Sequence, residues 1–305
     1  MITKSEFLEL IEPHEPCQEG LVLIDDCKDM TEVFKKMSGE DWAWLLKHQP
    51  QFAEHCDCWC TLTHWDWADL LQMQPQFACH CDCWDGLDGD DWARLLREQP
   101  QLAEHCNCWD RLDGEAWSYL LIEQPQFACY CDCWDELDGD DWSWLLAGQP
   151  KFAEYCDWSK LRGCDWAWLL REQPQFADKC NWSLLSGWEW AKLLRYQPQF
   201  SEHCDWSLLS DWNWLRLLSH QPQLAEHCDW SLLDGYNWSN ILLDQPQFAE
   251  HCDWSLLNSW NWSWLLSRQP QFACHCDWTT LSDVSWTHLL THQPQFKKYK
   301  EKYYD

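Results

Sequence analysis

The sequence has few basic side chains for its length. Its 305 residues include 21 Lys and Arg but 51 Asp and Glu, which gives a formal net charge of −30. A protein that binds DNA or RNA through its surface normally carries a basic patch. The shortage of basic residues therefore argues against direct nucleic-acid binding.

Long apolar runs and known catalytic motifs are also missing. No stretch approaches the roughly 20 continuous apolar residues that span a bilayer. The segment from Met1 to Glu9 lacks the apolar core of a signal peptide. We therefore expect a soluble, cytoplasmic protein with no membrane association. The sequence contains no Gly-rich phosphate loop, no Gly-x-Ser-x-Gly and no His-Glu-x-x-His, so we expect no enzymatic activity and no cofactor.

Aromatic residues and cysteines, by contrast, are abundant. The chain contains 29 Trp and 21 Cys, and 46% of its residues are hydrophobic. A chain with this much apolar surface does not remain a solvated coil. The composition therefore indicates a folded protein.

One short unit is repeated along most of the chain. The dipeptide Gln-Pro recurs first at intervals of 25 residues and then at intervals of 24, with its proline at positions 50, 75, 100, 125, 150, 174, 198, 222, 246, 270 and 294. A tryptophan, which we call the helix tryptophan, lies eight residues before each of these prolines. A fixed period of about 20–50 residues is typical of solenoids. We therefore predict eleven stacked repeats.

The first half of each repeat has the pattern of a short amphipathic helix. Trp190, Leu193, Leu194 and Gln197 follow the i, i+3, i+4, i+7 spacing of one helix face. Pro198 cannot continue that helix but suits the first position of a second one. Helices this short depend on stacking for their stability.

The second half predicts a further short helix and a third turn. Phe200 and Cys204 would form the buried side of the second helix. Asp205 is predicted to cap a turn of 3₁₀ type that begins at Trp206, and Asp57, Asp82 and Asp132 are expected to do the same in earlier repeats. The fold class expected is an all-α, right-handed solenoid (superhelix) of eleven 24–25-residue units, built from short α-helices and 3₁₀ turns, with a helical N-terminal cap.

The repeat resembles a Trp- and Leu-rich unit, W-x-x-LL-x-x-QPQFA-x-x-CDW, which is common in uncharacterised bacterial proteins. The resemblance covers about residues 40–296 and implies no established activity. The architecture is also similar to that of leucine-rich repeat variant solenoids. A shared fold does not by itself indicate a function.

Three segments follow from this pattern. Residues 1–38 lie outside the period and are predicted to form an N-terminal cap with helices at 5–11 and 31–37, because solenoids need atypical ends. Residues 39–296 form the repeat array, with 25-residue units up to about residue 150. Residues 297–305 form a short basic and aromatic tail.

The cysteines suggest packing more than chemistry. Ten of them occupy one column of the repeat, beginning with Cys56 and ending with Cys276. Stacked helices lie about 8–10 Å apart, which is too far for a disulfide between neighbours. Buried free thiols are therefore expected in this column. Cys79, Cys81 and Cys83 are weak candidates for a soft metal, and no metal is predicted.

Negative charge is concentrated in the first half of the chain. Residues 1–150 contain 32 acidic and 8 basic side chains, whereas residues 151–305 contain 19 and 13. We predict an acidic edge in residues 1–150 that is either a solubilising surface or a site for a cationic partner. Its candidate residues are Asp85, Asp88, Asp90, Asp135, Asp138 and Asp140.

Residues that vary between repeats are the candidates for recognition. The position two residues after each helix tryptophan changes freely, and we call this set the variable column. Trp and Arg at such positions are typical of binding hot spots. The predicted binding residues are Trp44, Arg94, Tyr119, Trp144, Trp168, Arg216 and Trp264.

The function expected is a non-catalytic scaffold that binds another macromolecule, a protein in the first instance, through the variable column and the acidic edge. Three alternatives remain open at this point. The chain could act as a DNA mimic that inhibits a nucleic-acid-binding protein, as a structural protein that assembles end to end, or as a thiol-rich metal-binding protein.

Overall fold

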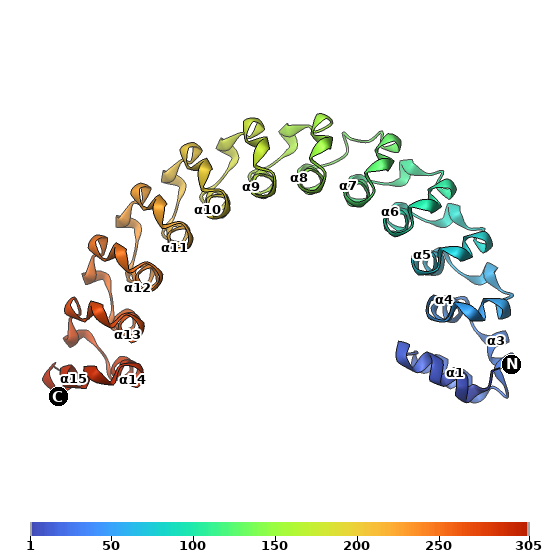
Figure 1. Cartoon of the computed structure of the whole chain (residues 1–305), viewed down its shortest axis with the longest axis horizontal. Helices are drawn as coiled ribbons and strands as arrows, with labels where there is room; N and C mark the ends of the chain where they lie inside the picture. Colours follow the sequence, from blue (N-terminus) through green and yellow to red (C-terminus); the bar gives the residue numbers. More distant parts are fainter. Residues whose placement is uncertain (1, 304–305) are drawn as a thin grey trace. The chain divides into compact units, whose positions relative to one another are not determined.

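The computed structural model describes residues 2–303 and contains only α-helices, 3₁₀-helices and loops in that range. Two compact parts are present, an N-terminal part (Met1–Asp157) and a C-terminal part (Trp158–Asp305). The boundary lies where the repeat shortens from 25 to 24 residues. Within each part, successive α-helices pack side by side (Figure 1). The prediction of an all-α solenoid is confirmed.

Each repeat contains one α-helix of ten residues. In the N-terminal part these helices are α4 (Gly39–His48), α5 (His64–Met73), α6 (Gly89–Glu98), α7 (Gly114–Glu123) and α8 (Gly139–Gly148). In the C-terminal part they are α9 (Gly163–Glu172), α10 (Gly187–Tyr196), α11 (Asp211–His220), α12 (Gly235–Asp244), α13 (Ser259–Arg268) and α14 (Asp283–His292). No helix among residues 2–303 is long and apolar enough to cross a membrane.

The helix starts are fixed by reciprocal caps. The Ser38 hydroxyl accepts a hydrogen bond from the Asp41 backbone N–H, and the Asp41 carboxylate accepts one from the Ser38 N–H. This capping box satisfies N–H groups that have no partner inside the helix. Asp88 and Asp138 serve as N-caps in the same way. Capping therefore accounts for more of the acidic residues than the sequence indicated.

The segment after each α-helix is a 3₁₀-helix that begins at the proline, as in Pro198–His203. The glutamine before it leaves the α-helical region, with φ −128° and ψ 67° at Gln197, because the proline ring disfavours the α conformation in the preceding residue. Phe200 is buried in this segment, and Cys204 ends it half-buried. The second helix of each repeat is thus shorter and tighter than an α-helix.

A third turn completes the repeat, and its cap differs between the two repeat lengths. In the 24-residue repeats the carboxylate of Asp205 accepts a hydrogen bond from the Ser207 N–H at the start of Trp206–Leu208, as predicted. In the 25-residue repeats the extra residue, Cys58 or Cys83, occupies the cap position and forms no side-chain cap. The prediction that Asp57 and Asp82 cap this turn is wrong, because the inserted cysteine moves each of them one residue away.

The tryptophan of this third turn, which we call the turn tryptophan, joins each repeat to the next. Trp206 stacks on the helix tryptophan of the following repeat, Trp214, with ring centroids 5.4 Å apart, and on His227 at 4.3 Å. Trp59 makes the same contacts with Trp67 and His80 in the N-terminal part. The helix tryptophans are fully buried. A chain of aromatic contacts therefore runs through the stacked repeats of each part.

Glutamine side chains form a second link between repeats. The Gln221 side-chain amide donates a hydrogen bond to the Arg195 carbonyl oxygen at 2.6 Å, and Gln223 donates to the Gln221 side-chain oxygen at 2.6 Å. Arg195 lies in the last turn of α10, where carbonyl groups lack partners inside the helix. In the Gln-Pro-Gln sequence, the first glutamine thus caps the α-helix of the previous repeat and the proline ends the α-helix of its own repeat. The second glutamine holds the capping side chain in place.

The N-terminal segment imitates a repeat. It contains α1 (Lys4–Ile11), α2 (Gln18–Asp26) and α3 (Met30–Lys36), of which α2 was not predicted. The Gln49 side chain donates to the Leu10 carbonyl oxygen at 2.9 Å, so α1 takes the place of a preceding repeat helix. Phe34 stacks on Trp42 and His55 in the manner of a turn tryptophan. These contacts place helices of the N-terminal segment against the first repeat.

The last residues described also pack on the array. Lys297–Tyr303 forms an α-helix of seven residues, α15, which follows the last repeat. Its Tyr299 stacks on Trp278 at 4.4 Å, in the position that His275 occupies on Trp254. The basic tail is thus anchored through one aromatic side chain.

Two neighbouring tryptophans allow the inter-repeat stacking to be tested. We expect Trp206→Ala to lower the free energy of unfolding by about 3 kcal/mol or more, because it removes a large ring packed between repeats. Trp212→Ala is the matched control, since Trp212 is 55% exposed, and it should cost about 1 kcal/mol or less. Urea unfolding followed by circular dichroism measures both; equal losses would contradict the assignment.

Candidate functional site

The α-helices of each part share one solvent-facing surface, which we call the helix face. It consists of two columns of side chains. One is the variable column, two residues after each helix tryptophan in the sequence. The other, which we call the leading column, contains the residues two positions before each helix tryptophan. Both columns point away from the buried Trp and Leu-Leu stripe, because positions four apart lie on the same side of a helix.

The predicted binding residues of the variable column lie on this face. Arg94, Tyr119, Trp144 and Arg216 are exposed, and Trp44, Trp168 and Trp264 are half-buried. The difference depends on neighbouring side chains. Arg268 covers the Trp264 ring at 3.7 Å from its centroid, and Trp44 packs against His48 at 5.1 Å.

Contacts between neighbouring helices organise the face in the N-terminal part. Lys47 of α4 pairs with Asp69 of α5, with 2.7 Å between the ammonium nitrogen and the carboxylate oxygen. Arg94 pairs with the buried carboxylate of Asp91 at 3.0 Å. The first of these ion pairs joins two neighbouring helices, and the second lies within α6.

The face of the C-terminal part is organised by aromatic rings. The guanidinium of Arg216 lies 4.7 Å from the Trp188 ring centroid, and the rings of Trp212 and Tyr236 are 5.4 Å apart. Trp260 contacts His288 at 5.4 Å. Each of these contacts joins one repeat to the next.

The leading column was missed by the sequence analysis, although it holds the most exposed tryptophans. Exposed aromatic residues occupy it on four successive helices of the C-terminal part, with exposed fractions between 47% and 55%: Trp188, Trp212, Tyr236 and Trp260. In the N-terminal part the same column is mainly acidic, with Glu40, Asp90, Glu115 and Asp140, and Trp65 between them. The signal was available, because all eight tryptophans outside the helix and turn columns lie two residues from a helix tryptophan, four of them after it and four before it. The four that precede it are Trp65, Trp188, Trp212 and Trp260.

Shallow grooves lie between successive helices of the N-terminal part. One, of about 310 Å³, lies between α4 and α5 and is lined by Trp44, Lys47, Trp65, Asp69 and Arg94 among others. Another, of about 270 Å³, lies between α6 and α7. Both combine aromatic or apolar surface with charges of both signs.

The six residues of the predicted acidic edge are all exposed but occupy three different positions. Asp85 and Asp135 lie in the third turn, and Asp88 and Asp138 are the N-caps of α6 and α8. Asp90 and Asp140 belong to the leading column. The charge therefore borders the helix face and partly serves helix capping.

Burial changes the ionisation of acids at the helix starts. Burial, reinforced by the charge of Asp88, raises the pKa of the Asp91 carboxyl, and burial likewise raises the pKa of Asp141. At Asp165 burial acts in the same direction, but hydrogen bonds from Arg162 outweigh it and lower the pKa. Asp91 and Asp165 are buried, and Asp141 is half-buried.

The three weak metal candidates are only partly brought together. The sulfur atoms of Cys81 and Cys83 lie 4.0 Å apart, whereas the Cys79 sulfur contacts the Gln76 carbonyl oxygen at 3.7 Å. Within residues 2–303, no group of three or more His, Cys, Asp or Glu side chains is arranged to hold a metal ion.

Histidines next to the column cysteines have a packing role. His80, His105, His203 and His227 each stack on a turn tryptophan of the preceding repeat, within 4.3–4.5 Å. Tyr130 stacks on Trp109 in the same position. The exchange of His for Tyr between repeats thus preserves a flat ring. These histidines show the geometry of aromatic packing.

Comparisons with protein-family models, with curated proteins and with solved structures find no match for this chain. Its resemblance to Trp- and Leu-rich bacterial repeats therefore stays a prediction.

The column cysteines predict a pH dependence of stability. Burial raises the pKa of their thiols to about 12 at Cys56, Cys81, Cys106, Cys131, Cys180, Cys204, Cys228, Cys252 and Cys276. A folded state that holds these protons more tightly than the unfolded chain loses stability as pH rises from about 9 towards 12. Below about pH 8 this effect should be absent.

We expect the triple variant Cys180→Ala, Cys204→Ala and Cys228→Ala to lose less unfolding free energy between pH 8 and pH 10.5 than the wild-type protein does. The control is Cys17→Ala, Cys60→Ala and Cys274→Ala, since these cysteines are exposed; its pH dependence should match that of the wild type. Urea titrations at each pH measure the difference, and identical slopes for all three proteins would contradict the assigned thiol shift.

Proposed function

We propose that this chain is a non-catalytic repeat scaffold that binds a protein partner through its helix face. The observation that carries the proposal is the pattern of exposure. In the C-terminal part four successive helices expose an aromatic residue at the same position, although a soluble protein gains nothing by leaving such large apolar rings in water. Exposed aromatic rings beside Arg are typical of binding hot spots.

The face also has the rigidity that a binding surface needs. Each recognition residue lies on a ten-residue helix whose start is capped and whose end is held by a glutamine of the next repeat. Side chains that are ordered before binding lose less conformational entropy when a partner docks. Variation of the leading and variable columns over an unchanged scaffold then gives specificity.

The charge distribution indicates what the partner presents. The leading column of the N-terminal part is mainly acidic, and that of the C-terminal part is aromatic. A protein with basic side chains opposite the first and apolar or aromatic side chains opposite the second would complement both. We propose that Asp90 and Asp140 of the acidic edge take part in this contact, together with Glu115.

A protein partner is favoured over DNA mimicry by the same surface. Neighbouring helices place leading-column carboxylates about 8–10 Å apart, whereas double-stranded DNA carries one phosphate charge per about 1.7 Å of its axis. Lys47, Arg94 and Arg97 also lie among the acids. A mimic of a phosphate backbone would not interrupt its negative charges with cations.

Affinity capture from the native host, with quantitative mass spectrometry, tests the proposal. One variant carries Trp188→Ala, Trp212→Ala and Trp260→Ala, and a second carries Asp90→Asn, Glu115→Gln and Asp140→Asn. We expect each variant to enrich the partners of the wild-type chain at least tenfold less than the wild type does, because several hot-spot contacts are removed together. Circular dichroism confirms that both variants remain folded.

The matched control carries Glu54→Gln, Glu104→Gln and Glu154→Gln, which remove the same charge from exposed positions on the 3₁₀-helices. It should retain the wild-type partners. If the aromatic and acidic variants both retain them as well, the helix face is not the binding surface and the proposal fails.

A further inference from the structure

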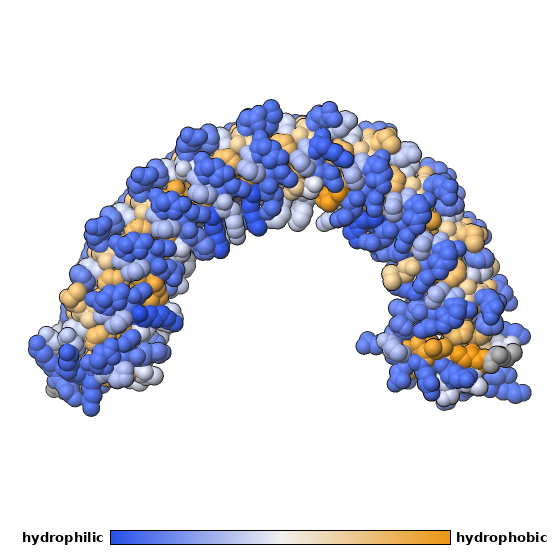
Figure 2. Space-filling model, in the orientation of Figure 1, coloured by the Kyte–Doolittle hydropathy of each residue, from blue (hydrophilic) through white to orange (hydrophobic). Residues whose placement is uncertain are grey.

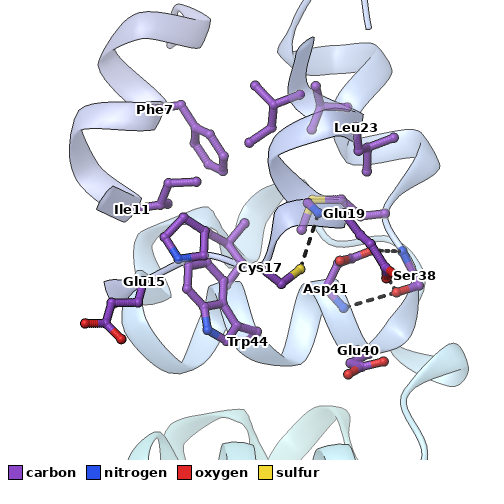
Figure 3. A pocket seen from close by; sticks show the side chains of 16 residues that line it. Phe7, Ile11, Glu15, Cys17, Glu19, Leu23, Ser38, Glu40, Asp41 and Trp44 are labelled. Atoms are coloured by element: carbon purple, nitrogen blue, oxygen red, sulfur yellow. Dashed lines mark hydrogen bonds between the residues drawn. The ribbon is translucent and has the colours of Figure 1, made fainter. Parts of the chain in front are cut away.

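A cavity lies between the N-terminal cap and the first repeat, and it is open to solvent at Cys17, Glu19 and Glu40, which are exposed. Its volume is about 360 Å³, and its lining comes from α1, α2, α3, α4 and the loop before α2 (Figure 3). Small-molecule sites typically have volumes of about 300–1,000 Å³. The cavity lies within the N-terminal part and is separate from the grooves of the helix face, although Trp44 and Glu40 border both.

The interior of this cavity is apolar. Phe7 and Ile11 of α1, Val33 of α3 and Leu45 of α4 are buried in its wall, and Trp44 is half-buried at its edge. Figure 3 shows Phe7 and Ile11 on one side and Leu23 across from them. In the space-filling view, strongly hydrophobic residues are visible over these N-terminal helices, bordered by hydrophilic ones (Figure 2). The cavity therefore offers an apolar stem a place out of water.

The charged residues of the lining all have the same sign. Four carboxylates belong to it, Glu15, Glu19, Glu40 and Asp41, and no Lys, Arg or His does. Figure 3 shows Glu15 directed away from the cavity, whereas Glu19 and Asp41 lie on the side of Ser38. Asp41 is engaged in the capping box with Ser38. Among residues 2–303, no basic side chain forms an ion pair with Glu19 or Glu40.

These two properties together define the ligand. An apolar anion could contact the apolar wall of the cavity, but the carboxylates would repel its charge. A hydrophilic cation would be attracted by the carboxylates but would make no apolar contact with the wall. A cation on an apolar stem satisfies both. We infer that this cavity binds an alkylammonium group, with its stem against Phe7, Ile11 and Leu23 and its charge beside Glu19 and Glu40.

An alkylammonium group can come from a free amine or from a lysine side chain of a polypeptide that carries apolar neighbours. The carboxylates and the apolar wall recognise the shared chemistry in both cases. The site differs from the proposed helix-face interface, because it needs none of the leading-column aromatic residues of the C-terminal part.

Isothermal titration calorimetry of the full chain with three probes of equal stem length tests the inference. The probes are octylamine, octanol and octanoate at pH 7, below the micelle-forming concentrations of the two ions and below the solubility limit of octanol. We expect octylamine to bind at least tenfold more tightly than octanoate, with octanol between them. Equal affinity for octylamine and octanoate, or no octylamine binding, would overturn the inference.

Two isosteric variants locate the charge. The double variant Glu19→Gln and Glu40→Gln should bring octylamine affinity to within a few-fold of octanol affinity and leave octanol binding unchanged. The control, Glu9→Gln and Asp25→Asn, removes the same charge from exposed positions of α1 and α2 outside the cavity lining. If the control lowers octylamine affinity as much as the cavity variant does, the effect is one of net charge and the site is not the one inferred.

A peptide arm distinguishes the two sources of the amine. The probes are acetyl-Leu-Lys-Leu-amide and the same peptide with an acetylated lysine side chain. Tighter binding of the charged peptide than of octylamine supports the inference and identifies a polypeptide lysine as the ligand. Binding of octylamine alone supports it and identifies a free amine. Failure of both amines to bind refutes it, whatever the result for the helix face.

Discussion

The stack of repeats depends on the contact between each turn tryptophan and the following repeat. Trp230 touches the helix tryptophan Trp238, the buried Phe248 and His251, with centroid separations between 4.5 and 5.4 Å. No repeat can bury its own helix tryptophan completely, because the ring that covers it belongs to the previous repeat. The period of the sequence is therefore the spacing at which this contact recurs. Phe34 and Tyr299 continue the pattern at either end with other aromatic side chains.

Burial of the helix tryptophans also has an energetic cost, because it leaves indole N–H groups without hydrogen-bond partners. The indole N–H groups of nine helix tryptophans are buried and have no hydrogen-bond partner among the described residues. Each such group costs about 1–3 kcal/mol, whereas truncation of a buried Trp ring costs about 3–5 kcal/mol. Packing thus outweighs the unsatisfied N–H. Because every repeat repeats this balance, stability grows with the number of stacked neighbours, and the helix face is left free to vary.

The sequence predicted the solenoid because Trp190, Leu193, Leu194 and Pro198 recur in register, and their spacing specifies helix, break and turn directly. It did not predict α2, which begins at Gln18 after the N-cap Cys17 and contains Gly20, a residue that is unfavourable within helices. It also misassigned the caps at Asp57 and Asp82, since one inserted cysteine changes the register of a short turn. The variable column was found from its variation. The leading column and the N-terminal cavity were not, because the exposure of a position depends on which neighbouring side chains cover it. Arg268 covers the Trp264 ring, whereas Trp212 stays 55% exposed beside Tyr236.

The most direct measurement of the central claim is the deletion of one whole repeat. Removal of residues 211–234, a full 24-residue period, joins Ser210 to Gly235 and brings Trp206 into register with Trp238. The contact between repeats is then restored, so the shortened chain should keep its helicity per residue and unfold cooperatively in urea. Removal of half a repeat, residues 211–222, breaks the register and should abolish the cooperative transition. Similar unfolding of the two deletions would contradict the claim that the turn tryptophan of one repeat holds the next in place.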